Sequence, residues 1–236
     1  MLLDTFNYIK QHLKSTFNNH CMFCLEPSSH TICHLCLDCL TKLNTQCPRC
    51  AEPNHHGEVC GQCLKLPPCF DQVVCPFIYS GAIKKLIITF KAKPNAIGSH
   101  HLVKSLSEQL AEYSYDGIVP IPYHWKNLLA RGHNPVRELT RLLSKDLNIK
   151  LIDGLIRDKY KPNQKSLKRK QRFRNLQGVF SVNIRVIEKA VRNKNILLVD
   201  DVLTTGATCN SAALSLKQAG AKSVTVACLA RTPAKT

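Results

Sequence analysis

The sequence lacks a long apolar stretch. Its 236 residues contain no run of about 18 apolar residues, the length that a membrane-spanning helix needs, so no transmembrane segment is expected. A secretory signal is also missing, because Asp4, Lys10 and Lys14 interrupt the apolar residues at the start of the chain. Residues 1–18 have near-helical apolar spacing and predict an amphipathic helix that packs on the neighbouring domain; a membrane-surface helix is the alternative. We expect a cytoplasmic protein, with a peripheral position at the inner membrane as the alternative.

Acidic side chains are scarce. The chain has 16 Asp and Glu residues against 33 Lys and Arg, for a formal net charge of +17. The balance favours a polyanion as partner.

The basic residues are concentrated between Arg157 and Arg174. Nine of these eighteen residues are Lys or Arg, and Asp158 is the one acid among them. The segment predicts contact with a polyanion. The alternative is a solvated basic surface loop. The candidate contact residues are Lys165, Lys168, Arg169, Lys170, Arg172 and Arg174.

The thirteen cysteines indicate metal rather than disulfides, because no secretory signal precedes them. Eight of them form four C-x-x-C pairs. Two such pairs can close a zinc tetrahedron, so the pattern predicts two structural Zn²⁺ ions with no open coordination position. The predicted ligands are Cys21, Cys24, Cys36, Cys39, Cys47, Cys50, Cys60 and Cys63.

The pairing of these ligands stays open at the level of sequence. Sequential pairing would give two ribbons, 21–39 and 47–63, and crossed pairing would give one interleaved module. We interpret the other cysteines, Cys33 among them, as small buried hydrophobic residues. His30, His34, His55 and His56 are interpreted as solvent-facing loop residues.

The stretch NILLVDDVLTTGAT, residues 195–208, has the pattern of a ribose-phosphate site. Four apolar residues predict a buried parallel strand, and Asp200 and Asp201 follow at its carboxyl end, where open α/β sheets bind ligands. A helix is expected from Ala207, and its first N–H groups would face an anion. Two aspartates for hydroxyl groups and a turn for phosphate suit a ribose 5-phosphate. The turn residues are Thr204, Thr205, Gly206, Ala207 and Thr208.

Beyond residue 71 the chain alternates predicted strands and helices, which indicates a parallel sheet. Strands are expected at 73–79, 117–121, 149–152, 195–199 and 223–230. Helices are expected between them, one of which should begin with Asn134 as N-cap and Pro135 as first residue.

The 195–208 stretch resembles the phosphoribosyl pyrophosphate (PRPP) loop of type I phosphoribosyltransferases. The resemblance implies that Asp200 and Asp201 bind the ribose hydroxyls, that Thr204–Thr208 hold the 5′-phosphate, and that Mg²⁺ accompanies PRPP. Arg131 and His133 follow the VPIP strand end, in the region that approaches the pyrophosphate in that fold; Arg131 could instead pair with a carboxylate.

From Cys21 to Arg231 the order of motifs resembles the ComF/ComFC family of competence proteins. The motifs are the cysteine pairs, FDQVVCPFIYSGAIKKLIITFK, IVPIPYHWKNLLARGHN, NQKSLKRKQRFRNLQGVF and the PRPP loop. The resemblance implies a type I phosphoribosyltransferase-like parallel sheet flanked by helices, preceded by a small N-terminal double zinc-ribbon module with four cysteine ligands per zinc. The expected boundaries are 1–18, 19–66 and 71–236.

The family resemblance favours a protein that binds single-stranded DNA through the basic segment during natural transformation. It implies a competence helicase and the DNA-uptake channel as further partners. The alternatives are an active phosphoribosyltransferase with an unknown acceptor and a PRPP sensor without catalysis. Thr204 stands where purine-salvage relatives carry a catalytic carboxylate. No catalytic residue is therefore assigned, and the sequence leaves open whether the chain is an enzyme.

Overall fold

The computed structural model describes residues 20–30, 32–93, 99–123, 132–157, 180–182 and 189–234. The predicted N-terminal helix, residues 1–18, lies outside the described residues. So do Arg131 and every candidate DNA contact between Lys165 and Arg174.

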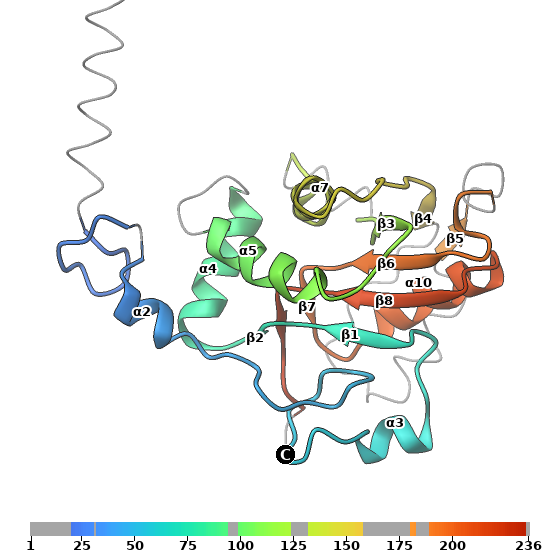
Figure 1. The fold of residues 1–236 in the computed structure, drawn as a ribbon, viewed down its shortest axis with the longest axis horizontal. Coiled ribbons are helices and arrows are strands. Elements are labelled where there is room, and N and C mark those ends of the chain that lie inside the picture. The colour runs from blue at the N-terminus through green and yellow to red at the C-terminus, as the bar shows by residue number, and fades with distance from the viewer. Residues whose placement is uncertain are drawn as a thin grey trace, which may run out of the picture.

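The centre of the fold is a four-stranded parallel sheet in the order β1-β8-β6-β3 (Figure 1). Its strands are β1 (Gln72–Val74), β8 (Ser223–Ala227), β6 (Asn195–Val199) and β3 (Gly117–Pro120). Residues 196–199 of β6 are fully buried, because strands pair on both sides and helices cover both faces. The predicted parallel α/β fold is confirmed.

Alternate residues of β6 face two different hydrophobic layers. Leu197 and Val199 belong to the core that includes buried residues of three helices, α4 (Gly81–Ala92), α5 (Ser99–Leu110) and α7 (Pro135–Asp146). Ile196 and Leu198 belong to the core beneath α10 (Ala207–Gln218). Two-residue periodicity of the strand therefore explains why helices pack on both faces.

The predicted start of α7 is also confirmed. The side chain of Asn134 accepts a hydrogen bond from the Arg137 N–H at 3.1 Å, as expected for the N-cap of α7.

Two smaller sheets flank the central one. The first is parallel, in the order β2-β9-β7, with strands β2 (Phe77–Ile78), β9 (Ala230–Arg231) and β7 (Val202–Leu203). The second pairs β4 (Leu155–Arg157) with β5 (Phe180–Val182) in antiparallel register.

Three of the expected strands differ from the structure. The strand expected at 73–79 is divided into β1 and β2, and the one at 223–230 is divided into β8 and β9, because each chain passes from one parallel sheet to the next. The strand expected at 149–152 is a single bridge between Leu151 and Ile118.

The cysteine-rich segment shares its core with the α/β sheet. It contains two short helices, α2 (His34–Asp38) and α3 (Gly61–Lys65). Cys21, Ile32 and Leu40 are buried in the layer of α4, α5 and α7, whereas Leu43 and Ala51 are buried in the layer of α10. Hydrophobic contacts thus cross the boundary expected between residues 66 and 71. Among the described residues, no helix has the length and apolar character to cross a membrane.

Candidate functional site

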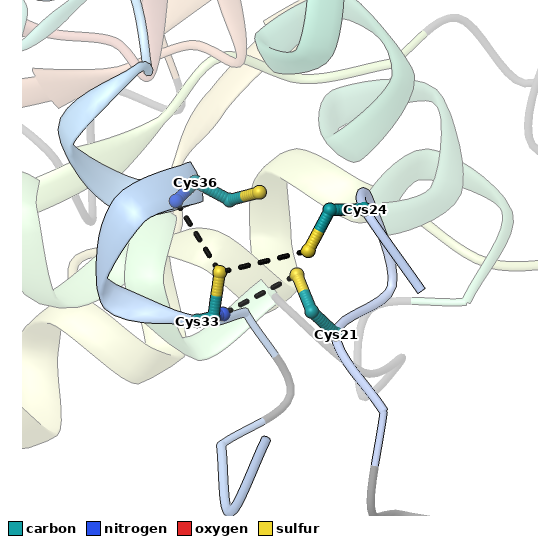
Figure 2. Close-up of side chains that lie close together, drawn as sticks. All are labelled: Cys21, Cys24, Cys33 and Cys36. Carbon is teal, nitrogen blue, oxygen red and sulfur yellow. Dashed lines mark hydrogen bonds between the residues drawn. The ribbon is translucent and has the colours of Figure 1, made fainter. Parts of the chain in front are cut away.

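Four sulfur atoms of the N-terminal segment converge on one point. Cys21, Cys24, Cys33 and Cys36 have their Sγ atoms within 4.8 Å of one another (Figure 2). The backbone N–H of Cys33 donates to Cys21 Sγ at 3.3 Å, and that of Cys36 donates to Cys33 Sγ at 3.4 Å. We call these residues the first Cys cluster.

The first Cys cluster corrects one predicted ligand. Cys39, predicted as a zinc ligand, lies outside the cluster and is exposed, and Cys33 occupies its place. Cys33 is the N-cap of α2 and Cys39 its C-cap, so they lie at opposite ends of this short helix. Because Cys33, Cys36 and Cys39 are equally spaced, the sequence contains two overlapping C-x-x-C pairs. The first of these, not the second, faces Cys21 and Cys24.

The second Cys cluster consists of Cys47, Cys50, Cys60 and Cys63, all predicted as ligands and all brought together. The Cys60 N–H donates to Cys47 Sγ at 3.3 Å, as Cys33 does in the first cluster. Both clusters use ligands that are sequential in the chain, so the pairing that the sequence left open is sequential, with ligand spans of 21–36 and 47–63.

The spacing of sulfur atoms fits zinc. Tetrahedral Zn²⁺ with Zn–S bonds of about 2.3 Å requires sulfur atoms about 3.8 Å apart. The Cys24 and Cys33 sulfurs are separated by 3.7 Å, and so are those of Cys50 and Cys60. Each cluster can therefore hold a zinc ion, with all four positions of the tetrahedron filled by protein.

The thiol pKa values differ sharply within each cluster. Burial opposes ionisation of Cys47, but backbone N–H groups of Cys60, Cys50 and Arg49 outweigh it and lower the pKa of this thiol to about 7. In contrast, burial raises the pKa of Cys50 to about 12. Without a bound cation, Cys47 therefore ionises much more readily than Cys50 in the second Cys cluster. A bound Zn²⁺ would supply the charge that allows all four to ionise.

The predicted ribose-phosphate turn follows β6 at the carboxyl end of the sheet. Asp200 and Asp201 come directly after the strand, β7 follows them, and residues 204–206 lead into α10. Gly206 is the N-cap of α10 and has a φ of +73°, a conformation that favours glycine. The structure thus places the two carboxylates and the N-terminus of a helix on one short loop, the arrangement that an anion with hydroxyl groups needs. Binding of such a ligand stays a prediction.

The two aspartates have different surroundings. Burial, reinforced by the negative charge of Asp201, raises the pKa of Asp200 to about 7, and the Cys209 thiol donates to its Oδ2 at 3.6 Å. Asp201 is buried and pairs with Lys91 Nζ at 2.7 Å. The Tyr123 hydroxyl donates to the other oxygen of Asp201 at 3.0 Å. Near neutral pH, one carboxylate is therefore neutralised by a cation and its neighbour is partly protonated.

Lys91 and Tyr123 were not predicted as site residues. Lys91 lies near the end of α4, one residue after the buried Phe90, and Tyr123 follows the VPIP strand end. His133, which was predicted near the pyrophosphate, lies next to Lys91: its Nε2 is 3.0 Å from the Lys91 carbonyl oxygen.

Comparisons with known proteins agree with this architecture. Residues 128–236 match the phosphoribosyl transferase domain. Competence protein F of Haemophilus influenzae is 29% identical over 227 residues, which cover 91% of this chain and 98% of that protein. DNA utilization protein YhgH of Escherichia coli is 30% identical over 214 residues, with coverage of 85% and 90%. Competence protein ComFC of Bacillus subtilis is 26% identical over 210 residues, with coverage of 84% and 82%.

Proposed function

The chain belongs to the ComF family of competence and DNA utilization proteins, and from this premise we propose that it binds single-stranded DNA and assists its handling in the cytoplasm during natural transformation. We further propose that the loop at Asp200–Thr208 binds PRPP or a related ribose phosphate. A DNA end shares the phosphate group of this ligand but lacks its 2′-hydroxyl, so the phosphate turn is the part of the loop that both ligands could use.

The observation that carries the DNA-binding proposal is where the described chain stops before the basic segment and where it resumes after it. The described chain stops at Arg157, the last residue of β4, and resumes at Phe180 of β5, which pairs with Arg157. Ser215 of α10 donates to the Phe180 carbonyl oxygen at 3.1 Å. Ser215 lies eight residues, about 12 Å of helix, from the start of α10 at the ribose-phosphate loop. A strand of DNA bound by the basic segment could therefore reach that loop.

The ribose-phosphate proposal is supported by the chemistry of the loop. Asp200 and Asp201 can accept hydrogen bonds from ribose hydroxyls, and the N-terminus of α10 can receive the 5′-phosphate. Lys91 adds a cation beside the acidic pair, which suits an anionic ligand. Mg²⁺ would arrive with the pyrophosphate of PRPP and neutralise part of its charge.

A salt titration tests DNA binding. If phosphate contacts dominate, the logarithm of the affinity for single-stranded DNA falls linearly with the logarithm of the salt concentration. Replacing Lys168, Arg169 and Lys170 together by Ala is expected to weaken binding and flatten this slope. The matched control replaces three exposed lysines of α4 and α7, namely Lys84, Lys85 and Lys145. Equal slopes for the two triple variants would contradict the role of the basic segment.

Competition tests whether the two ligands share a site. PRPP with Mg²⁺ is expected to displace DNA that ends near the loop, and Asp200→Asn/Asp201→Asn is expected to abolish PRPP binding. Independent binding of both ligands would show that PRPP and DNA occupy different sites. Pyrophosphate release in the presence of candidate acceptors would instead support a phosphoribosyltransferase, the alternative that the acidic pair favours.

A further inference from the structure

A buried arginine joins the ribose-phosphate loop to the second Cys cluster. Arg231 lies on β9, beside β7, and its side chain is only 1% exposed. Its Nη1 donates to the Thr204 carbonyl oxygen at 2.6 Å, at the first residue of the turn. Its Nη2 donates to the carboxylate of Glu52. The guanidinium group thus holds the loop on one side and the cysteine-rich segment on the other.

Glu52 belongs to the turn that carries two ligands of the second Cys cluster. It stands two residues after Cys50, and its carbonyl oxygen accepts from the Cys47 N–H at 2.8 Å. Its second carboxylate oxygen accepts from the Ala234 N–H at 2.6 Å. The C-terminal part of the chain runs to the cysteine-rich segment, as Figure 1 shows. One side chain therefore ties this turn to both β9 and the residues that follow it.

The first Cys cluster provides an internal comparison. Both clusters begin with the same pattern, C-x-x-C-x-E-P, at residues 21–27 and 47–53. In both, the glutamate carbonyl oxygen accepts from the first cysteine N–H at 2.8 Å, and the residue before the glutamate has a positive φ, 63° at Leu25 and 55° at Ala51. Yet Glu26 is exposed, and its side chain makes no hydrogen bond or ion pair among the described residues. The turn itself consequently does not require the carboxylate, and in Glu52 that group is available for Arg231.

The buried charge makes this connection energetically demanding. A guanidinium group removed from water needs a charged partner, and loss of one member of such a pair leaves the other uncompensated. Moreover, the Arg231 Nε is buried and has no hydrogen-bond partner among the described residues. Glu52 is the carboxylate paired with this arginine in the described part of the chain. Displacement of Glu52 should therefore also displace Arg231 and with it the Thr204 carbonyl.

We propose that Glu52 and Arg231 are positioning residues through which metal in the second Cys cluster keeps the ribose-phosphate loop in its binding conformation. Zinc fixes the turn that bears Glu52, Glu52 fixes Arg231, and Arg231 fixes Thr204. Loss of this zinc releases the loop, whereas loss of zinc from the first Cys cluster does not act by this route. The inference rests on the proposed ribose-phosphate binding for its functional consequence.

Hydrogen exchange on the full chain, without ligand, tests the physical connection. Glu52→Gln keeps the shape of the side chain and removes its charge, and Glu26→Gln is the matched control in the first repeat. The amides of residues 202–210 are expected to exchange about ten-fold faster in E52Q and at the wild-type rate in E26Q. Equal exchange in the two variants overturns the connection.

A metal-ligand pair tests the dependence on zinc. Cys60→Ser and Cys33→Ser each remove the ligand at the N-cap of a short helix, and elemental analysis should find one zinc ion fewer in each. Faster exchange at residues 202–210 is expected in C60S alone. The double variant E52Q/R231M removes both charges; it should regain stability relative to E52Q, yet keep the fast loop exchange because Thr204 still lacks its donor. Normal loop exchange in this double variant would mean that the pair serves stability alone.

Calorimetry with PRPP and Mg²⁺ then measures the functional consequence. E52Q and C60S are expected to bind PRPP at least about ten-fold more weakly than E26Q and C33S, respectively. Equal affinities within each pair overturn the inference even if the wild type binds PRPP well. If the wild-type protein fails to bind PRPP, the proposed function fails, and the exchange measurements alone decide whether the connection exists.

Discussion

The raised pKa of Asp200 predicts that this residue costs the unliganded protein stability above acidic pH. The ordinary pKa of an aspartate side chain is 3.8, and burial followed by repulsion from Asp201 raises that of Asp200 to about 7. Between these values the folded protein holds a proton that the unfolded chain has released. The contribution of Asp200 to the free energy of unfolding is thus fully present below the unfolded pKa and is lost as the pH rises through the folded one.

The size of the effect follows from the two pKa values. Moving a carboxyl pKa from 3.8 to about 7 corresponds to about 4 kcal/mol between the two protonation states. About 2 kcal/mol of this falls between about pH 5.5 and pH 8, because stability drops by about 1.4 kcal/mol per pH unit until the folded pKa is passed. Asp200→Asn stays neutral throughout, so its stability relative to the wild type should increase by about 2 kcal/mol over this interval.

Urea denaturation of both proteins at several pH values measures this difference. Both contain the same cysteine clusters, so any effect of pH on bound metal cancels between them. Asp153→Asn is the control, because Asp153 is an exposed carboxylate paired with Arg137 at 2.6 Å and should shift the wild-type curve with little change of shape. Parallel curves for D200N and the wild type would refute the reasoning, since they would mean that Asp200 ionises in the folded protein as easily as in the unfolded one.

Three further predictions concern individual residues. Cys39→Ser should retain two zinc ions and Cys33→Ser should retain one; the opposite result would restore Cys39 as a ligand. Lys91→Met removes a positive charge that lowers the pKa of Asp200, so this pKa should rise further and PRPP affinity should fall about ten-fold by calorimetry; tighter binding would contradict a role for Lys91 in anion recognition. Gly206→Ala should destabilise the fold by about 1 kcal/mol because of its positive φ, measured by urea denaturation; no crowding is expected, because an added Cβ would lie 3.8 Å from Phe70.

The sequence was most informative where local periodicity and strand ends determine structure. The apolar run of β6 and the acidic pair after it lie where the pattern predicts, because the short length of the run and the turn residues after it distinguish a buried strand from a buried helix. The identity of the fourth ligand of the first Cys cluster was predicted incorrectly. Two overlapping C-x-x-C pairs share Cys36, and pair counting does not distinguish them.

A repeat in the sequence contains the missing information. HCMFCLEP aligns with QCPRCAEP, and in the second repeat the third ligand, Cys60, follows Cys50 by ten residues. In the first repeat Cys33 follows Cys24 by nine residues and Cys36 follows it by twelve, so the repeat favours the pair Cys33 and Cys36 over the pair Cys36 and Cys39. Lys91 and Tyr123, in contrast, come from segments far from the loop in the sequence. Their approach to Asp201 depends on how α4 and the end of β3 pack against the sheet, and no local pattern encodes it.

The same packing explains why the two Cys clusters share hydrophobic cores with the domain that carries the proposed ribose-phosphate loop. Cys21 and Ile32 are buried in the layer of α4, the helix whose Lys91 neutralises Asp201. Ala51 is buried in the layer of α10, and the neighbouring Glu52 reaches Thr204 through Arg231. Short helices of five residues cannot stabilise themselves in water, so their positions depend on metal and on these shared cores. The first Cys cluster thus shares only a hydrophobic core with α4, whereas the second is joined to the phosphate turn by the polar contacts of Glu52 and Arg231.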